Sequence, residues 1–241
     1  MADNYPGAPS RLAQSERNAV SAYAARAEWP AGFAVYQSGS PADGVFIVES
    51  GRVVLRSRVR AARGFIPWIA TPGETFGSEG LAPNGRYATD ARADGPTETL
   101  FLSGERLRAF LREQPRSALA LLSQLMAERA SLLEKLRELT TLSVEQRLIT
   151  ALVRLAATDT FTRDDGRIAL VPERYRLLCE LVGATRESVS LVLSRLVGEG
   201  LVERVGSTLI VARLPELLAR RHATDGSEVL GLTAVEASPS A

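Results

Sequence analysis

The residues best suited to chemistry form one short run, Thr185-Arg186-Glu187-Ser188-Val189-Ser190. An arginine guanidinium can donate two hydrogen bonds to a guanine edge, and a glutamate carboxylate can accept one from cytosine. Hydroxyl groups beside them are suited to phosphate oxygens, which position a protein on a duplex without reading its sequence. The run therefore indicates contact with nucleic acid rather than catalysis.

Other chemistries find too few suitable residues. The chain has a single cysteine, Cys179, and a single histidine, His222. One chain therefore cannot build a disulfide, a four-cysteine or two-cysteine, two-histidine zinc site, or a cysteine-ligated iron–sulfur cluster. A Ser-His-Asp triad would need His222, which lies in a weakly patterned tail. We expect no enzyme activity, no catalytic residues and no metal site.

Composition adds a constraint on any contact with DNA. The 241 residues include 29 basic and 28 acidic side chains, for a formal net charge of +1. Nucleic-acid binders are typically more basic, so DNA contact must depend on where the charges lie. The first residues lack a signal-peptide pattern, and no apolar run approaches the roughly 18–20 residues that span a bilayer. We expect a cytoplasmic protein without a membrane partner.

Two helices and a hairpin are expected to position the run. Helices over 173–182 and 185–199 are separated by Gly183-Ala184, and strands over 201–204 and 208–211 flank a turn at 205–207. This is the winged helix-turn-helix pattern, whose second helix enters the major groove. Thr185 is a suitable N-cap. The inward face is expected to carry Val189, Val192, Leu193 and Leu196, and the outward or flanking faces Arg186, Glu187, Ser190, Leu191 and Ser194.

The first half of the chain predicts a helix followed by a series of short strands. Residues 11–28, rich in Ala and Arg, predict a helix that ends at Trp29-Pro30, because a residue before proline avoids the α region. Short β-rich runs follow at 33–36, 45–48, 53–59, 65–70 and 98–102. Their spacing and turn residues predict a sandwich or barrel, so the whole chain is expected to be α+β.

Residues 116–142 contain no Pro or Gly and predict one long helix. Steps of four and three residues form a heptad seam, which needs a partner helix. The favoured interpretation is that this helix forms a homodimer, and the alternative is a helix buried within one domain. Ser143-x-x-Gln146 is a capping box that begins the next helix, so a hinge is expected near 140–143. The seam comprises Leu122, Leu125, Arg129, Leu132, Leu136 and Leu139 after Ala118, and a second stripe, Leu119, Met126 and Leu133, is expected to pack against the chain's own β domain.

Two separate blocks resemble the cAMP receptor protein/FNR family of bacterial transcription regulators. Residues 178–190, LCELVGATRESVS, are similar to the family pattern L-A-x-x-x-G-x-[ST]-R-E-[ST]-V-[SG]. Upstream, GVFIVESG at 44–51 and PGETFG at 72–77 are similar to its strand-and-turn signatures. The blocks come in the family's order with the heptad helix between them, and the resemblance covers roughly residues 30–217.

The resemblance implies a domain plan and a set of DNA contacts. By the resemblance we expect a cyclic-nucleotide-binding-like β-roll (jelly roll) over 29–114, the dimerisation helix over 115–142 and the winged helix-turn-helix domain over 143–221. Outside it, the local sequence pattern predicts a tail and helix over 1–28 and a mobile tail over 222–241. The protein is expected to bind double-stranded palindromic DNA as a homodimer, and to contact RNA polymerase if it is an activator. The cAMP receptor protein has an arginine where this chain has Leu191, which can touch a thymine methyl instead. The resemblance maps the family's recognition residues onto Arg186, Glu187 and Leu191. From the residue types and their places on the helices, Ser190 is a further expected base contact, and the expected phosphate contacts are Arg174, Arg176, Thr185, Ser188 and Arg195.

The resemblance also implies an effector pocket in the β-roll. In cyclic-nucleotide sensors of the family, a short helix start and an arginine hold the phosphate, while a glutamate takes the ribose hydroxyl. Here Glu79 is displaced by one position, Tyr87 stands where Ser or Thr is usual, and the long helix offers only leucines. The pocket positions are Gly77, Ser78, Glu79, Arg86, Tyr87, Leu132 and Leu133.

These departures leave three functions open. We expect a transcription regulator whose effector is unknown or absent, with no haem and no iron–sulfur cluster. The alternative is a regulator that responds to a cyclic nucleotide. A more remote alternative is a β-roll signalling module that does not bind DNA. Cys179 is expected to be buried and inert, since reactive thiols lie in exposed electropositive sites.

Overall fold

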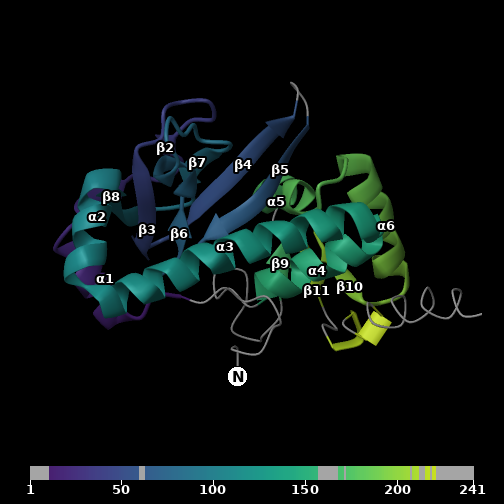
Figure 1. Ribbon diagram of the computed structural model, residues 1–241. Helices are drawn as coiled ribbons and strands as arrows, with labels where there is room; N and C mark the ends of the chain where they lie inside the picture. Colours follow the sequence, from purple (N-terminus) through teal and green to yellow (C-terminus); the bar gives the residue numbers. More distant parts are fainter. Residues whose placement is uncertain are drawn as a thin grey trace, which may run out of the picture. The chain divides into compact units, whose positions relative to one another are not determined.

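The computed structural model describes residues 11–59, 63–156, 168–170, 172–206, 208–211, 215–217 and 219–220. The chain divides into two compact units, Met1–Thr140 and Thr141–Ala241. Figure 1 draws both, and each is described here by itself. The tail expected over 222–241 lies outside the described residues.

The N-terminal unit is a β-roll built from two four-stranded antiparallel sheets. One sheet has the strand order β1-β8-β3-β6 and the other β2-β7-β4-β5. This arrangement confirms the expected α+β class with an N-terminal roll. The strands are β1 (Ala25–Trp29), β2 (Ala34–Tyr36), β3 (Gly44–Ser50), β4 (Val53–Val59), β5 (Arg63–Ala70), β6 (Thr75–Phe76), β7 (Asp90–Ala93) and β8 (Thr97–Ser103), with a short 3-10 helix η1 (Ser78–Leu81) between β6 and β7.

Strand β3 shows how the sequence divides the roll into two cores. Successive side chains of a strand point to opposite faces. Val45 and Ile47 accordingly belong to a cluster with the helices, whereas Phe46 and Val48 belong to a second cluster inside the roll. Because both faces are covered, the strand is a nearly continuous apolar run rather than an alternating one.

The helix expected over 11–28 is wrong in its second half. Helix α1 covers only Gln14–Ser21, and Ala25–Trp29 forms the edge strand β1. This strand pairs with β8, with Ala25 opposite Phe101 and Trp29 opposite Thr97. The side chain of Trp29 adds a hydrogen bond from Nε1 to Thr99 Oγ1 at 2.9 Å. Alanine and arginine favour helix locally, but pairing with a neighbouring strand outweighs that preference.

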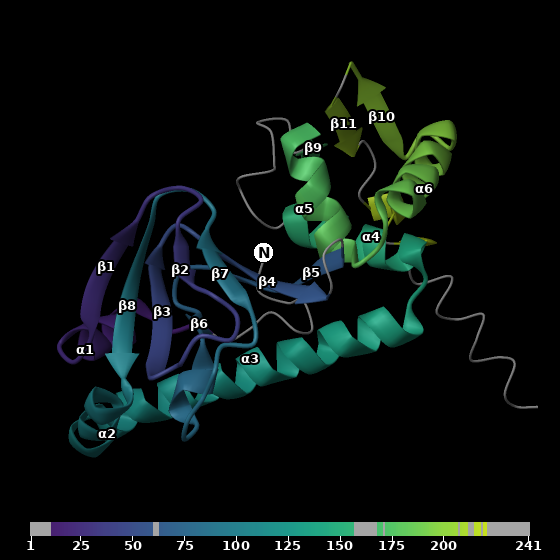
Figure 2. The same ribbon diagram turned by 90° about the horizontal axis from the view of Figure 1, so that it is seen from above.

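Two helices follow the roll. Helix α2 (Gly104–Glu113) packs on β8 and β3, and helix α3 (Pro115–Thr141) continues from it. Phe110 of α2 and Leu121 of α3 are fully buried with Val45 and Ile47 of the sheet. Figure 2 shows the roll above α2 and the first half of α3.

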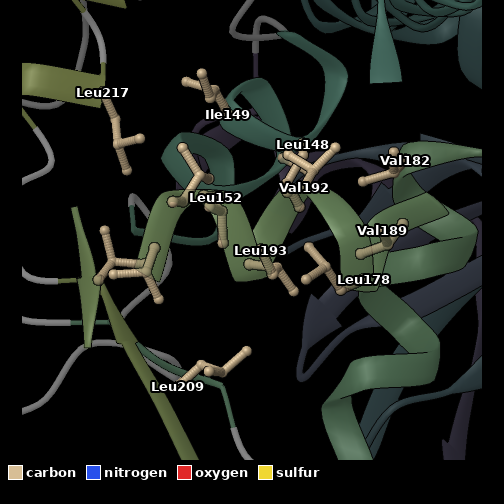
Figure 3. Packing of buried hydrophobic residues seen from close by; sticks show 14 of the residues in the cluster. Leu148, Ile149, Leu152, Leu178, Val182, Val189, Val192, Leu193, Leu209 and Leu217 are labelled. Carbon is tan, nitrogen blue, oxygen red and sulfur yellow. The ribbon is translucent and has the colours of Figure 1, made fainter. Parts of the chain in front are cut away.

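The described part of the C-terminal unit combines helices with a small sheet. Its elements are α4 (Val144–Ala156), β9 (Ile168–Leu170), α5 (Pro172–Val182), α6 (Arg186–Gly198), β10 (Val202–Val205) and β11 (Thr208–Val211), and the sheet order is β10-β11-β9. The expected capping box is confirmed, because Ser143 N donates to Gln146 Oε1 at 2.8 Å and Gln146 N donates to Ser143 Oγ at 3.2 Å. Helices α4, α5 and α6 share one apolar core, and Figure 3 shows Leu193 among its neighbours.

Candidate nucleic-acid interface

The start of α6 is fixed by its capping residue. Thr185 has extended backbone angles, and its hydroxyl accepts from Ser188 N at 3.3 Å. Gly183 turns the chain between α5 and α6 with φ +65°, a left-handed conformation that glycine adopts without steric cost. The cap and the turn together define where the first residues of α6 point.

The two faces of α6 separate as the sequence predicts. Val189, Val192, Leu193 and Leu196 are buried, which confirms the expected inward face. Arg186, Glu187 and Ser190 are exposed, and Leu191 is 75% exposed. A leucine this exposed contributes nothing to the core, so its apolar side chain is available to a partner.

Tyr175 on α5 adds a residue that sequence reasoning missed. The Arg186 guanidinium lies over its ring, 5.4 Å from the centroid. Burial raises the pKa of Tyr175, while a side-chain hydrogen bond with Ser190 and the charges of Arg186 and Arg204 lower it. Tyr175 thus contacts Arg186 and Ser190, two of the expected base contacts, and lies near Arg204 of β10. The sequence signal that could have identified this residue is a tyrosine one turn into the helix that precedes the recognition helix.

Glu187 presents an ionised acceptor. Its own backbone N–H and the Thr185 side chain hydrogen-bond to the carboxylate and lower its pKa. The group is exposed. It can therefore accept a hydrogen bond from an external donor such as a cytosine amine.

The expected phosphate contacts are arranged less simply. Arg176 is exposed and pairs with Glu180 at 3.1 Å on its own helix. Arg195 is ion-paired with Glu145, which also binds Arg220. Arg195 must leave this pair before it can reach a phosphate. The hydroxyl groups of Thr185 and Ser188 are hydrogen-bonded to each other at 3.1 Å. The side chain of Arg174 lies outside the described residues.

Cys179 is buried, as expected. Burial raises the pKa of its thiol, which disfavours the reactive thiolate. Within the described ranges, no group of three or more His, Cys, Asp or Glu side chains is arranged to hold a metal ion. In the same part of the chain, no helix is long and apolar enough to cross a membrane.

Comparison with known proteins agrees with this geometry. Residues 26–114 match the family described as "Cyclic nucleotide-binding domain", and residues 146–221 match "Crp-like helix-turn-helix domain". The "Cyclic AMP receptor protein" of Thermus thermophilus is 32% identical over 210 residues, which cover 86% of this chain and 92% of that protein. The chain belongs to the CRP/FNR family.

This CRP/FNR regulator is also similar to a second curated relative and to a solved structure. A "CRP-like cAMP-activated global transcriptional regulator" of Mycobacterium tuberculosis is 25% identical over 195 residues, 80% of this chain and 86% of that protein. The solved structure of the c-di-GMP responsive global regulator CLP of Xanthomonas campestris superposes with a TM-score of 0.71 at 24% identity, covering 83% of this chain and 99% of that one. The chain is a CRP/FNR-type transcription regulator with a Crp-like helix-turn-helix.

The β-roll interior of this CRP/FNR regulator is filled by aromatic rings. Tyr36 and Tyr87 stack with centroids 3.7 Å apart and planes 8° apart, and Phe46 stacks on Phe76 at 5.1 Å. Burial raises the pKa of Tyr87 to about 12. Tyr87 therefore contributes to the core, whereas Arg86 is exposed and donates to Gly39 O at 2.7 Å.

Helix α3 places a carboxylate against this region. Glu128 is 6% exposed, and its two carboxylate oxygens accept from Thr75 Oγ1 at 3.0 Å and Ser78 Oγ at 3.1 Å. Burial raises the pKa of Glu128 to about 7, although both hydroxyls act to lower it. Sequence reasoning did not single out Glu128, because no local pattern links it to residues about fifty positions earlier.

The pKa of Glu128 predicts a stability change with pH. A proton binds more tightly in the folded than in the unfolded chain, so the contribution is full below the ordinary pKa of 4.5 and is lost as pH rises to about 7. We expect the N-terminal unit to be more stable at about pH 5 than at about pH 8, and Glu128→Gln to flatten this slope. Thermal unfolding followed by tryptophan fluorescence measures it, since Trp29 and Trp68 both lie in this unit.

Glu74 contributes a background slope of the same sign, because burial also raises its pKa. The informative quantity is therefore the difference between the wild type and Glu128→Gln. Equal slopes in both proteins would contradict the assignment to Glu128.

The faces of α3 differ from the expectation. Leu119, Met126 and Leu133, expected against the chain's own roll, are 67%, 60% and 56% exposed. The buried face instead carries Ala118, Leu121, Gln124, Glu128, Lys135 and Glu138. The expectation assumed that one apolar stripe must pack against the roll. The sequence pattern alone does not show that polar residues occupy much of the buried face instead.

The exposed residues nevertheless form one continuous stripe. Leu119, Leu122, Met126, Leu133 and Leu136 are separated by three, four, seven and three residues, which keeps them on one side of the helix, and all are exposed in the single chain. Of the expected seam, Leu132 and Arg129 are also exposed, Leu139 is partly buried, Leu125 packs partly against the roll's core, and Ala118 is buried.

Proposed function

We propose that the chain is a homodimeric, sequence-specific regulator that binds palindromic promoter DNA through α6. The observation that carries this proposal is the exposed polar start of α6, with Arg186, Glu187 and Ser190 beside Leu191. Dimerisation through the exposed stripe of α3 would present two recognition helices about 34 Å apart, one turn of DNA. Binding to chromosomal DNA implies a cytoplasmic protein, and activation would add RNA polymerase as a partner.

An electrophoretic shift with a salt titration tests the proposal. We expect weak, strongly salt-dependent binding to random-sequence DNA and tight binding to a palindrome selected from a random library. A complete absence of salt-dependent binding would favour the β-roll signalling module without DNA contact.

A second candidate is a regulator that responds to a cyclic nucleotide. It is favoured by the match of residues 26–114 to a cyclic nucleotide-binding domain and by the relative named as cAMP-activated. The same DNA measurement with and without added cAMP distinguishes it from a regulator that needs no effector.

Leu191 is proposed to read a thymine methyl. We expect Leu191→Arg to shift the preferred base toward guanine at the step that this side chain faces, because arginine can donate to guanine O6 and N7. Binding to operators varied at that single step measures the shift. Unchanged preference would show that this position does not read DNA.

Tyr175 is proposed to hold Arg186 ready for its base. A cation–π contact contributes about 0.5–1 kcal/mol at an exposed site. Since a dimer has two such contacts, we expect Tyr175→Leu to weaken operator binding roughly five- to thirtyfold. Tyr175→Phe keeps the ring and loses only the hydroxyl contact with Ser190, so its effect should be smaller. Equal effects of the two variants would argue against the ring contact.

A further inference from the structure

The turn expected to hold an effector phosphate is covered by the protein's own rings. Gly77, which precedes η1, has φ +74°. A Cβ added there would lie 3.1 Å from Tyr87 Cε1, 3.2 Å from Tyr36 Cε1 and 3.3 Å from Phe46 Cδ2. Three aromatic side chains therefore occupy the space beside this glycine.

The cation expected for the phosphate is also engaged elsewhere. Arg86 lies at the surface, where it donates to Gly39 O at 2.7 Å. Its neighbour Tyr87 points inward and stacks on Tyr36. The order of these two residues in the chain thus places an aromatic ring inside the roll and the charge outside it.

A carboxylate takes the hydroxyl donors of the same turn. Glu128 accepts from Thr75 and Ser78, which flank the Phe76-Gly77 step. The nearby Glu79 carboxylate, held by Ala88 N at 3.1 Å, adds a second negative group that acts on Glu128. An anionic ligand placed here would meet charge repulsion in a poorly solvated region. The residues present therefore do not fit a cyclic phosphate.

We propose that the effector region of this regulator is closed by its own side chains, with Glu128 joining α3 to the Thr75–Ser78 turn in place of an anionic effector. Either protonation state of Glu128 can bind both hydroxyls, because a carboxylic acid can accept from one and donate to the other. The junction is therefore present without any ligand. This inference rests on the proposed function, since its consequence is DNA binding that needs no cyclic nucleotide.

Direct ligand binding tests the closure independently of DNA. Full-length protein is titrated with cAMP and, separately, with cGMP at up to about 1 mM in a calorimeter, and its unfolding temperature is measured with each nucleotide. We expect no binding heat and no rise in unfolding temperature. Saturable binding of either nucleotide to the wild type overturns the closure, whatever the protein does with DNA.

DNA affinity tests the coupling. We expect wild-type affinity for the selected palindrome to change less than about twofold with cAMP. Glu128→Leu removes both oxygens of the junction and is expected to weaken this affinity about tenfold, a typical size for coupling between sites. Thr75→Val combined with Ser78→Ala removes the donors and leaves Glu128, and should have a similar effect. Glu134→Leu, on the same helix, removes an ion pair with Arg137 and serves as the matched control.

The outcomes separate the inference from the proposed function. If both junction variants fold by tryptophan fluorescence and bind DNA like the wild type, the coupling is overturned while the proposed function stands. If cAMP strengthens wild-type DNA binding more than about twofold, the closure is overturned in favour of the cyclic-nucleotide regulator. If the wild type binds no DNA, the proposed function fails, and the calorimetric result still decides the closure.

Discussion

Met126→Glu combined with Leu133→Glu is expected to convert the protein from a dimer to a monomer. Both side chains are exposed in the single chain and lie on one stripe of α3. Burying each apolar side chain stabilises a dimer by roughly 1.5–3 kcal/mol, and the two substitutions remove four of them. We expect the dissociation constant to rise at least about ten-thousandfold, measured by sedimentation across protein concentration.

A matched control is available on the same helix. Ala127 is partly exposed and is not three or four positions from any residue of the stripe, so Ala127→Glu adds a charge of the same sign without removing a stripe residue. It should sediment as the wild type does. A double variant that stays dimeric would show that this stripe is not the interface. A dimer that dissociates should also lose most operator affinity, because each separate monomer then binds a single half-site instead of two linked recognition helices binding one palindrome together.

Arg186→Ala is expected to remove most sequence preference and little non-specific binding. A good bidentate contact to guanine discriminates by about 1–3 kcal/mol, and a palindrome contains two. Operator affinity should fall by roughly thirty- to twenty-thousandfold, whereas affinity for a scrambled duplex changes only by the loss of one charge per subunit. Competition binding at several salt concentrations measures both affinities.

Arg186→Lys distinguishes base reading from charge. Lysine keeps the positive charge but lacks the planar fork that reaches two acceptors at once. If Arg186 reads guanine, the lysine variant should lose most of the operator preference. Wild-type preference in Arg186→Lys would assign this residue to phosphate contact.

These experiments also reflect the near-zero net charge of the chain. With 29 basic and 28 acidic residues, little affinity comes from overall charge. Some of the arginines are also held by acids, as Arg195 is by Glu145 and Arg176 by Glu180. Specific affinity must then depend on a few groups such as Arg186 and on dimerisation, which doubles them.

The sequence by itself determined the local features of the recognition unit. Thr185 as N-cap, the Ser143–Gln146 capping box and the buried face of α6 all follow from residue types within four positions of one another. Such contacts depend on helical spacing, which is fixed by backbone geometry. For the same reason the family blocks, each a short contiguous pattern, were sufficient to indicate the family.

Tertiary structure decided what depends on distant partners. Residues 25–29 form a strand because they pair with β8, which lies about seventy residues later in the chain. Glu128 of α3 faces the roll, where the hydroxyls of Thr75 and Ser78 satisfy its carboxylate. The ring of Tyr87, and not the guanidinium of Arg86, lies inside the roll, because Tyr36, Phe46 and Phe76 form an apolar interior there. Burial and hydrogen-bond satisfaction are properties of the assembled fold, and neither is written in the spacing of nearby residues.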